Sequence, residues 1–216
     1  MRPLKVIGYY TPNRDYPEMA RRMQVSAEAV GLSCEICEMP DISESGCPRT
    51  MNWVRHIGYS AAVVLQAMRN YPDHRLLYLD ADAEVMQYPA LLDEWDGVQI
   101  AYPMVNGYLV SNTVYFANEP GDMAMVEAWD RETQDRLTRM SAGDYNHPYR
   151  EAWDQSALQD TLPLFPQIVT RELPWEYAFI GPKPSWPKPI EVMPGIAAED
   201  VVIRQYQASQ QYMLSI

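Results

Sequence analysis

The sequence lacks a long hydrophobic run and is poor in cysteine. No apolar stretch reaches the roughly 18 residues of a membrane span, and the apolar start of the chain is too short for a secretory signal. Three cysteines cannot all pair, so a disulfide framework is excluded. With 47% apolar and 11% aromatic residues, the 216-residue chain is also too hydrophobic for intrinsic disorder. We expect one soluble, cytoplasmic domain.

Signatures of several enzyme classes are absent as well. The chain has no G-x-x-x-x-G-K-[ST], no G-x-G-x-x-G and no G-x-S-x-G. ATPase, dehydrogenase and α/β-hydrolase functions therefore lose their usual support. Cys34 and Cys37 form a C-x-x-C pair, but a structural zinc site needs four ligands and the only nearby histidine is His56. We interpret the cysteines, including Cys47, as ordinary buried thiols.

Basic residues are missing from one long stretch. The chain carries 17 Lys and Arg against 29 Asp and Glu, a net charge of −12. No Lys or Arg lies between Arg75 and Arg131, where ten acidic residues fall. Two of these, Asp80 and Asp82, directly follow an apolar run, and carboxylates held together repel unless a cation lies between them. The stretch is either a solvated acidic surface or contains a cation site.

Alternating strand and helix patterns predict an α/β fold in the first half of the chain. The strands are expected at Leu4–Tyr10, Cys34–Met39 and Leu76–Leu79, and the helices at Pro17–Val30 and Met51–Asn70. The third strand is apolar on both faces, which is typical of the middle of a parallel sheet. We therefore expect a mixed, mostly parallel central sheet flanked by helices.

The second half of the chain departs from this alternation. Strands expected at Val98–Pro103 and Tyr108–Asn118 flank an Asn-Gly turn, which indicates an antiparallel element. Two helices follow, at Gly121–Met140 and Trp153–Thr161, and a last strand at Val201–Ile203. The remaining chain is proline-rich and predicted to be mostly loop. No linker or repeat divides the chain, so residues 1–216 form one predicted domain.

The sharpest motif is Asp80-Ala81-Asp82 at the end of the apolar strand. In an extended chain the two carboxylates lie on the same face, so both can reach one hard cation. Open α/β sheets bind ligands at the carboxyl ends of their strands. A cation there can bridge two phosphates of a nucleotide and stabilise charge on a leaving group. The alternative is a capped strand end with two solvated carboxylates.

This motif and its neighbours resemble the GT-A glycosyltransferases, in which one α/β domain binds a nucleotide-sugar and carries a metal-binding D-x-D. The resemblance spans nearly the whole chain and implies a nucleotide-sugar-binding half, 1–100, and an acceptor-side half, 101–216. It is carried, in order, by Asn52-Trp53 with Arg55-His56, Tyr78–Ala83, Asn112–Asn118, Trp153–Leu158, Leu173-Pro174-x-x-Tyr177 and Val202–Ser209.

The resemblance implies a donor site at the end of the first strand. Tyr9, Tyr10 and Thr11 would hold the base and ribose, and Arg55 would join them from the helix before the motif. An aromatic pair at a strand end is otherwise core or rim, and that alternative stays open. The donor would be a nucleotide-diphospho-sugar, with a UDP-sugar such as UDP-glucose favoured.

The same resemblance implies a bound Mn²⁺ or Mg²⁺. Asp82 would be the principal ligand, and Asp80 would contact both the ribose and the metal. Many relatives add a histidine from the closing strand, but the matching Arg204-Gln205-Tyr206-Gln207 has none. Gln205 offers a carbonyl oxygen, which binds less strongly, and Arg204 could neutralise the diphosphate directly. We expect weak metal dependence.

Asp154 and Gln155 would face the sugar. A carboxylate there could orient a hydroxyl or act as a base, whereas an amide can only bind or stabilise. The Asp-Gln pair resembles retaining families more than inverting ones, so transfer of a hexose with retention is expected. Asp144, in a polar loop, is a second candidate base on the acceptor side, although an ordinary loop aspartate fits the same pattern.

The acceptor hydroxyl stays open at this point. Compact members of this superfamily are familiar from phages, where some glucosylate hydroxymethylated bases in DNA. The acidic balance argues against a DNA footprint, whereas Arg131, Arg136, Arg139 and Arg150 gather near the acceptor side. A hydroxymethylated pyrimidine of phage DNA, a saccharide and a small molecule are the alternatives. A degenerate, non-catalytic binding module is a further one.

Overall fold

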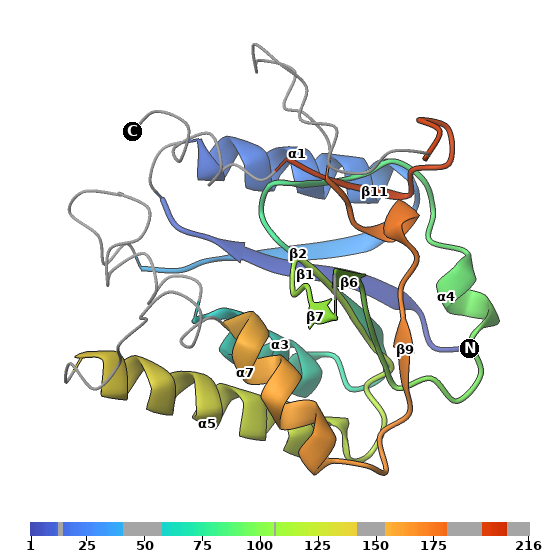
Figure 1. Ribbon diagram of the computed structural model, residues 1–216. Helices are drawn as coiled ribbons and strands as arrows, with labels where there is room; N and C mark the ends of the chain where they lie inside the picture. Colours follow the sequence, from blue (N-terminus) through green and yellow to red (C-terminus); the bar gives the residue numbers. More distant parts are fainter. Residues whose placement is uncertain (13–14, 41–57, 106, 142–153, 181–195, 207–216) are drawn as a thin grey trace.

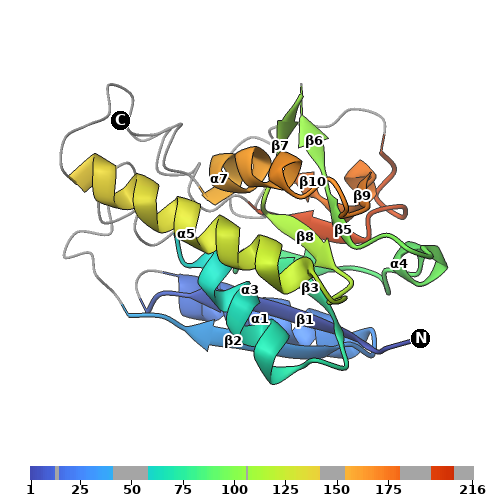
Figure 2. The ribbon, with the colours of Figure 1, turned by 90° about the horizontal axis from the view of Figure 1, so that it is seen from below.

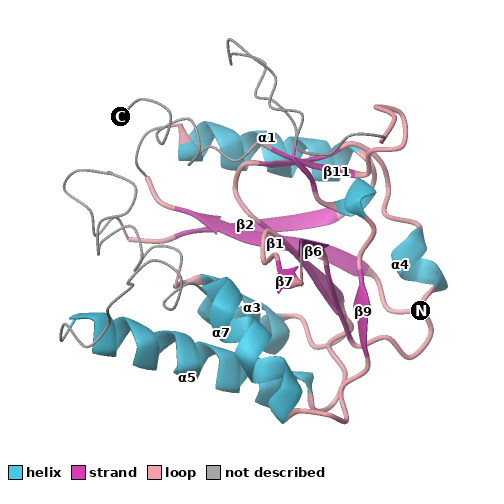
Figure 3. Cartoon of the chain, in the orientation of Figure 1, coloured by secondary structure: helices cyan, strands magenta, loops and turns pink. Residues whose placement is uncertain are grey.

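The structure is a computed structural model that describes residues 1–12, 15–40, 58–105, 107–141, 154–180 and 196–206. Its centre is a six-stranded sheet in the order β2-β1-β3-β8-β5-β9 (Figure 1). Helix α1 covers one face, and α3, α5 and α7 cover the other (Figure 3). This arrangement confirms the predicted α/β class and the mostly parallel sheet flanked by helices.

The first half of the sheet matches its prediction. Strands β1 (Leu4–Tyr10), β2 (Ser33–Glu38) and β3 (Arg75–Leu79) run parallel, and α1 (Tyr16–Ala29) connects the first two. All five residues of β3 are buried, because strands flank it on both sides and helices cover both faces of the sheet. Its apolar composition is therefore explained by its central position.

Helix α3 (Ser60–Asn70) is shorter than predicted. Residues 58 and 59 form a turn, and residues 51–57 lie outside the described part of the chain. Gly58 is a poor helix former, since an unrestrained backbone loses more entropy in a helix. Two further helices were predicted, α5 (Asp122–Ser141) and α7 (Asp154–Thr161). Helix α5 packs beside α3, and α7 packs beside α5 (Figure 2).

The predicted pair of long strands is broken into four. Strands β5 (Ile100–Tyr102) and β8 (Thr113–Phe116) join the central sheet, and β8 runs antiparallel to both β3 and β5. Between them, β6 (Met104–Val105) and β7 (Tyr108–Leu109) form a separate hairpin. Proline has no N–H for a sheet ladder, so the main strand ends at Pro103, whose carbonyl accepts from Val110 N at 2.9 Å.

A smaller, three-stranded sheet begins with the strand that follows β3 in the chain. It contains β4 (Ala83–Val85), β11 (Ile203–Gln205) and β10 (Phe179–Ile180). The last strand therefore lies two residues later than the predicted Val201–Ile203, because its antiparallel register pairs 203–205 with 83–85. The remaining elements of the described residues are α4 (Leu91–Glu94), β9 (Thr170–Glu172) and two 3₁₀ turns, Leu162–Leu164 and Trp175–Tyr177.

The cysteines on β2 are half-buried rather than buried, because β2 is the edge of the sheet. Burial and the nearby Glu28 carboxylate raise the pKa of the Cys34 thiol to about 12, so it is a poor nucleophile at neutral pH. Cys47 lies outside the described residues. No helix in the described part of the chain is long and apolar enough to cross a membrane.

Candidate active site at the carboxyl end of the central strands

Most of the predicted site residues that the structure describes lie at one edge of the central sheet. Strands β1 and β3 are parallel, so their carboxyl ends meet there, and the antiparallel β8 begins at the same edge. Asp80 follows β3, Tyr9 is the last residue but one of β1, and Asn112 precedes β8. This is the edge at which open α/β sheets bind ligands.

The Asp-x-Asp segment forms a turn rather than the predicted extended chain. Ala83 N donates to the Asp80 carbonyl at 2.9 Å, and Asp80 N donates to the Asn112 carbonyl at 3.1 Å. The turn still holds the carboxyl groups of Asp80 and Asp82 within electrostatic range. The Asp82 carboxylate raises the pKa of Asp80, adding to the larger effect of burial. Asp82 itself is 9% exposed.

Asp154 brings a third carboxyl group to this edge. It begins α7, is 7% exposed, and accepts hydrogen bonds from the Ser60 hydroxyl and, at 3.3 Å, from Ser111 Oγ. Burial raises the pKa of Asp154, and its charge also raises the pKa of Asp80. Gln155 lies beside it and accepts from Ser111 N at 3.4 Å. Three acidic groups therefore share this site, and no basic side chain among the described residues is seen to lower the pKa of Asp80.

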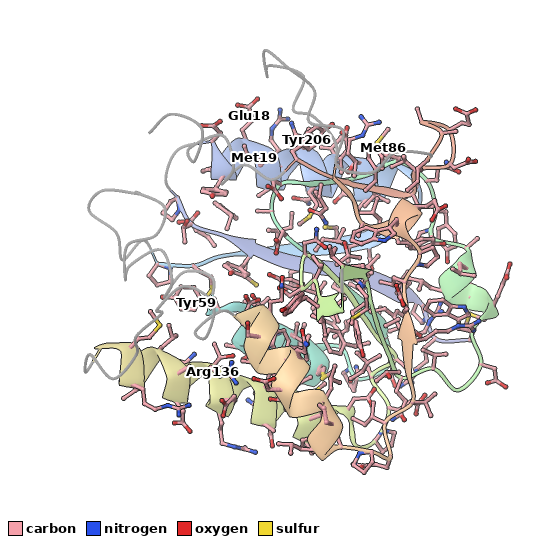
Figure 4. All side chains as sticks on the ribbon, in the orientation of Figure 1. Glu18, Met19, Tyr59, Met86, Arg136 and Tyr206 are labelled. Carbon is pink, nitrogen blue, oxygen red and sulfur yellow. The ribbon has the colours of Figure 1, made fainter. Side chains whose placement is uncertain are left out.

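Tyr9 belongs to this site and Tyr10 does not, because successive strand residues point to opposite faces. The Tyr9 ring packs edge-on against Tyr59, 6.0 Å between centroids, and burial with the charges of Asp154 and Asp80 raises the pKa of its hydroxyl. The Tyr10 hydroxyl instead donates to Glu38 at 2.6 Å on the outer surface. Figure 4 labels Tyr59 at the start of α3.

Two further groups complete the described donor side. Tyr78 OH lies 3.1 Å from Asp80 Oδ1 and 3.2 Å from Ser60 Oγ. It therefore links Asp80 to the first residue of α3, whose hydroxyl also donates to Asp154. Thr11 is buried at the end of β1. Arg55, Arg150, Asp144 and the rest of the predicted acceptor loop lie outside the described residues.

Gln205 reaches the site from the far end of the chain. It is fully buried, and its Nε2 donates to the Asn112 carbonyl at 2.9 Å and to Thr113 Oγ1 at 3.0 Å. Its Oε1 is buried and has no hydrogen-bond partner within the described residues. Since β11 pairs Gln205 with Ala83, the side chain lies next to the Asp-x-Asp turn. The register pairs Arg204 with Glu84, on the opposite face of this small sheet.

Asn112 is the site residue to which the sequence assigned no role. It is 7% exposed, and both polar atoms of its side-chain amide are buried without a partner in the part of the chain described. Each such atom costs about 1–3 kcal/mol of desolvation, so both need a ligand or water to bind them. The sequence does hint at a role for Asn112, because it directly precedes a buried strand and lies in the Asn112–Asn118 segment that resembles the glycosyltransferases.

The oxygen atoms at this edge fit a hard divalent cation. Two carboxylates and the unpartnered Gln205 Oε1 form an oxygen donor set of the kind that suits Mg²⁺ or Mn²⁺. No group of three or more His, Cys, Asp or Glu side chains able to hold a metal occurs among the described residues. The protein would therefore supply few ligands, as is usual for Mg²⁺ sites completed by water and phosphate.

The predicted arginine cluster on α5 is largely engaged within the protein. Arg136 forms ion pairs with Glu132 and Asp160, both at 2.7 Å, and its side chain is 10% exposed. Arg139 lies 3.6 Å from the same Glu132. Figure 4 shows Arg136 on the outer helix layer. A buried, paired guanidinium is already neutralised, so it contributes little to binding nucleic-acid phosphate.

No known protein-family profile matches the sequence, and no curated protein does. Among solved structures, the chain superposes on a glycosyltransferase involved in the glycosylation of the major capsid of PBCV-1, with a TM-score of 0.59 at 11% identity. That match covers 98% of this chain and 99% of the other. The chain has a glycosyltransferase fold.

Two larger glycosyltransferases match less well. The glycosyltransferase GlyE of Streptococcus pneumoniae TIGR4 has a TM-score of 0.47 at 14% identity, and the bifunctional glycosyltransferase WbbM has 0.47 at 10%. These matches cover 82% and 81% of this chain but only 46% and 39% of theirs. The chain thus spans less than half the length of either protein.

Proposed function

We propose that this protein is a metal-dependent glycosyltransferase that moves a hexose from a nucleotide-diphospho-sugar to a hydroxyl group. One observation carries the proposal. Three carboxyl groups and two amides with unpartnered polar atoms converge, among the described residues, on the ligand-binding edge of a glycosyltransferase fold. Such an edge is unfavourable in the empty protein, and a cation with a phosphate-bearing ligand would satisfy it.

The carboxylates of Asp80 and Asp82 and the oxygen of Gln205 would hold the cation. A bound Mn²⁺ or Mg²⁺ would supply the positive charge that stabilises the departing diphosphate. Tyr78 keeps Asp80 in place through its hydroxyl. Tyr9, beside these groups, is the described aromatic that best fits a role in holding the nucleoside, as the sequence suggested, with a UDP-sugar as the favoured donor.

The sugar would bind between Asn112 and Asp154. The Asn112 amide offers both a donor and an acceptor without partners in the described structure, which matches the hydroxyl groups of a hexose. The two serine hydroxyls that Asp154 accepts from fix its carboxylate in one orientation. That orientation suits a group that aligns a sugar hydroxyl or stabilises positive charge at the reacting carbon. Retention of configuration is the outcome we propose.

The charge distribution favours a saccharide acceptor over a DNA base. The chain has a net charge of −12, and Arg136, the most buried of the predicted acceptor-side arginines described, is neutralised by its own ion pairs. The full-length structural match acts in the glycosylation of a viral capsid, and a glycan-bearing protein fits the proposed acceptor class. A hydroxymethylated pyrimidine in DNA is the second acceptor to test.

Ligand-dependent thermal stability tests the donor site directly. UDP, GDP, CDP and their sugars are added with and without Mn²⁺, and a ligand at about 100 times its Kd should add about 2.7 kcal/mol. We expect one nucleotide to stabilise only with metal, and the Asp82→Ala variant to lose that effect. Asp96→Asn, an exposed acid elsewhere, is the matched control and should keep it. Binding without turnover would support the non-catalytic binding module instead.

Product analysis then tests transfer. The stabilising donor is incubated with oligosaccharides and with DNA containing 5-hydroxymethylcytosine, and masses are measured for a hexose increment. We expect transfer to a saccharide, and transfer to the DNA alone would reverse the proposed acceptor. The anomeric proton coupling of the product, measured by NMR, distinguishes retention from inversion.

A further inference from the structure

Arg22, on the second turn of α1, has buried polar atoms that the catalytic site does not explain. Its Nε and Nη2 are buried and have no hydrogen-bond partner in the described structure. Its guanidinium carbon instead lies 4.3 Å from the centroid of the Tyr206 ring. A cation over an aromatic face is attracted to the negative face of the ring, and this contact compensates part of the missing hydrogen bonding. Arg22 is therefore committed to Tyr206.

Tyr206 also accepts a hydrogen bond from the Arg204 side chain, and it makes two contacts next to the Asp-x-Asp turn. Its backbone N donates to the Asp82 carbonyl at 3.2 Å, and its hydroxyl donates to the Glu84 carboxylate. Its side chain is 3% exposed. Figure 4 shows Tyr206 alongside α1, with Met19 and Met86 on either side in that view. The residue thus joins α1, the turn and β4.

The neighbour of Tyr206 in the chain is Gln205, whose buried Oε1 has no hydrogen-bond partner among the described residues. Strand β11 contains only three residues, and so short a pairing has few backbone hydrogen bonds to fix its position. An error of about 1 Å in a ligand's position is enough to weaken a metal site or a reaction. The two hydrogen bonds of Nε2 anchor one side of the Gln205 amide, and side-chain contacts at the end of β11 would help to fix where Oε1 lies.

We propose that Arg22 and Tyr206 are positioning residues that clamp the end of β11, so that Gln205 Oε1 faces the cation held by Asp80 and Asp82. The proposal rests on the metal site of the proposed function. The Nε and Nη2 of Arg22 are covered by protein, so the proposal gives Arg22 no direct contact with the donor. It acts on the cation only through Tyr206 and Gln205.

The first test measures binding of Mn²⁺ alone, by electron paramagnetic resonance of the free ion. We expect Arg22→Met to weaken Mn²⁺ binding roughly tenfold, the scale of outer-shell effects on metal sites. Arg22→Lys keeps a cation over the ring and should recover part of the loss. Arg21→Met, an exposed neighbour on the same helix, is the matched control and should bind as wild type does. Circular dichroism checks that each variant folds.

A measurement without metal distinguishes local loosening at the end of β11 from global destabilisation of the protein. Hydrogen exchange of the peptide covering residues 203–206 should accelerate in Arg22→Met, because the Tyr206 N–H that donates to Asp82 is released more often. Exchange in the buried strand β3 should stay unchanged. Equal acceleration in both segments would show global destabilisation and would overturn the proposal.

The decisive measurement is a double-mutant cycle with Gln205→Ala. If Arg22 acts through Gln205, Arg22→Met causes no further loss of Mn²⁺ affinity in the Gln205→Ala background. Additive losses would overturn the clamp. If wild type binds Mn²⁺ in an Asp82-dependent way but Arg22→Met binds equally well, only the clamp fails. If Asp82→Ala binds Mn²⁺ as tightly as wild type, the proposed metal site fails, and the clamp with it.

Discussion

The two ends of strand β3 differ in how their charges are balanced. At the amino end, Arg75 is buried and each of its three nitrogens donates a hydrogen bond: to the Arg2 carbonyl at 2.8 Å, the Leu92 carbonyl at 2.8 Å and the Asp93 carboxylate at 2.6 Å. At the carboxyl end, Asp80 lies near two other carboxyl groups, and their charges raise its pKa. The first arrangement stabilises the empty protein, whereas the second needs a ligand.

Two asparagines at opposite ends of β8 show the same contrast. The Asn118 Nδ2 donates to the carbonyls of Tyr71 and His74, at 3.0 and 3.1 Å. The Asn112 amide makes no hydrogen bond to the described residues, although Asn112 is buried. The same side chain thus has a structural role at one end and an unfilled binding capacity at the other. The unmet hydrogen bonding of both atoms of the Asn112 amide, beside three carboxyl groups, is what favours a ligand at the carboxyl end.

The contrast also shows that a hollow alone does not mark a site. A cavity of about 510 Å³ lies at the amino end, lined by residues that include Arg2, Arg75 and Trp95. The arginines that line it are already committed, since Arg2 bonds the carbonyls of Ala117 and Asn118. The polar groups that could hold a ligand lie at the opposite end of the sheet.

The largest expected effect is on activity at the carboxyl end. Asp82→Asn should lower kcat/KM for glycosyl transfer by at least about 100-fold, since a metal ion supplies several kcal/mol of transition-state stabilisation. Its free energy of unfolding without metal should not fall, because the variant removes a charge from a crowded acidic site. Steady-state kinetics and urea unfolding measure the two quantities. Full activity of Asp82→Asn would contradict a catalytic role for the carboxyl end of β3.

The second effect is on stability at the amino end. Arg75→Met should lower the free energy of unfolding by about 3 kcal/mol, because it leaves the Leu92 carbonyl and the Asp93 carboxylate without their donor. The activity of the folded fraction should be unchanged. Urea unfolding with a rate assay below the transition checks both. A loss of activity without a loss of stability would show that this end is functional too.

Substitution of Asn118 and of Asn112 should have smaller effects on stability, and the two effects should differ in sign or size. Asn118→Ala should destabilise by about 2 kcal/mol, through two buried carbonyls left unbonded and a backbone φ of 61° that suits Asn better than Ala. Asn112→Ala should leave stability unchanged or higher, since no hydrogen bond is lost, while raising KM for the donor. Equal destabilisation by the two substitutions would contradict the assigned roles.

The smallest effect is a pH dependence of stability. Burial, Asp82 and Asp154 raise the pKa of Asp80 in the folded protein above its unfolded value near 4. Folding therefore binds protons at this group, and its contribution to stability is lost as the pH rises from about 4 through the folded pKa. Asp80→Asn cannot ionise, so its stability advantage over wild type should grow across that window in metal-free buffer. Calorimetry over pH measures it, and a constant difference would refute the shift.

The sequence alone predicted the first three strands, α1, α5 and α7 to within one or two residues. These elements follow from local periodicity and from turn residues, which act over a few positions. The sequence also predicted an acidic motif after a buried strand, because strand burial and the following carboxylates lie in one short segment. Assigning this motif to a metal and a nucleotide-sugar needed the family resemblance and stays a prediction.

The tertiary structure decided what joins distant segments. It placed Gln205 against Asn112 across 93 positions of sequence, left the oxygen of the first and the amide of the second without partners in the described chain, and put Arg22 over Tyr206. It also turned Tyr10 away from the site and bent the Asp-x-Asp segment. No local pattern encodes these relations, because whether a buried polar atom finds a partner depends on the packing of segments that meet only in the folded protein.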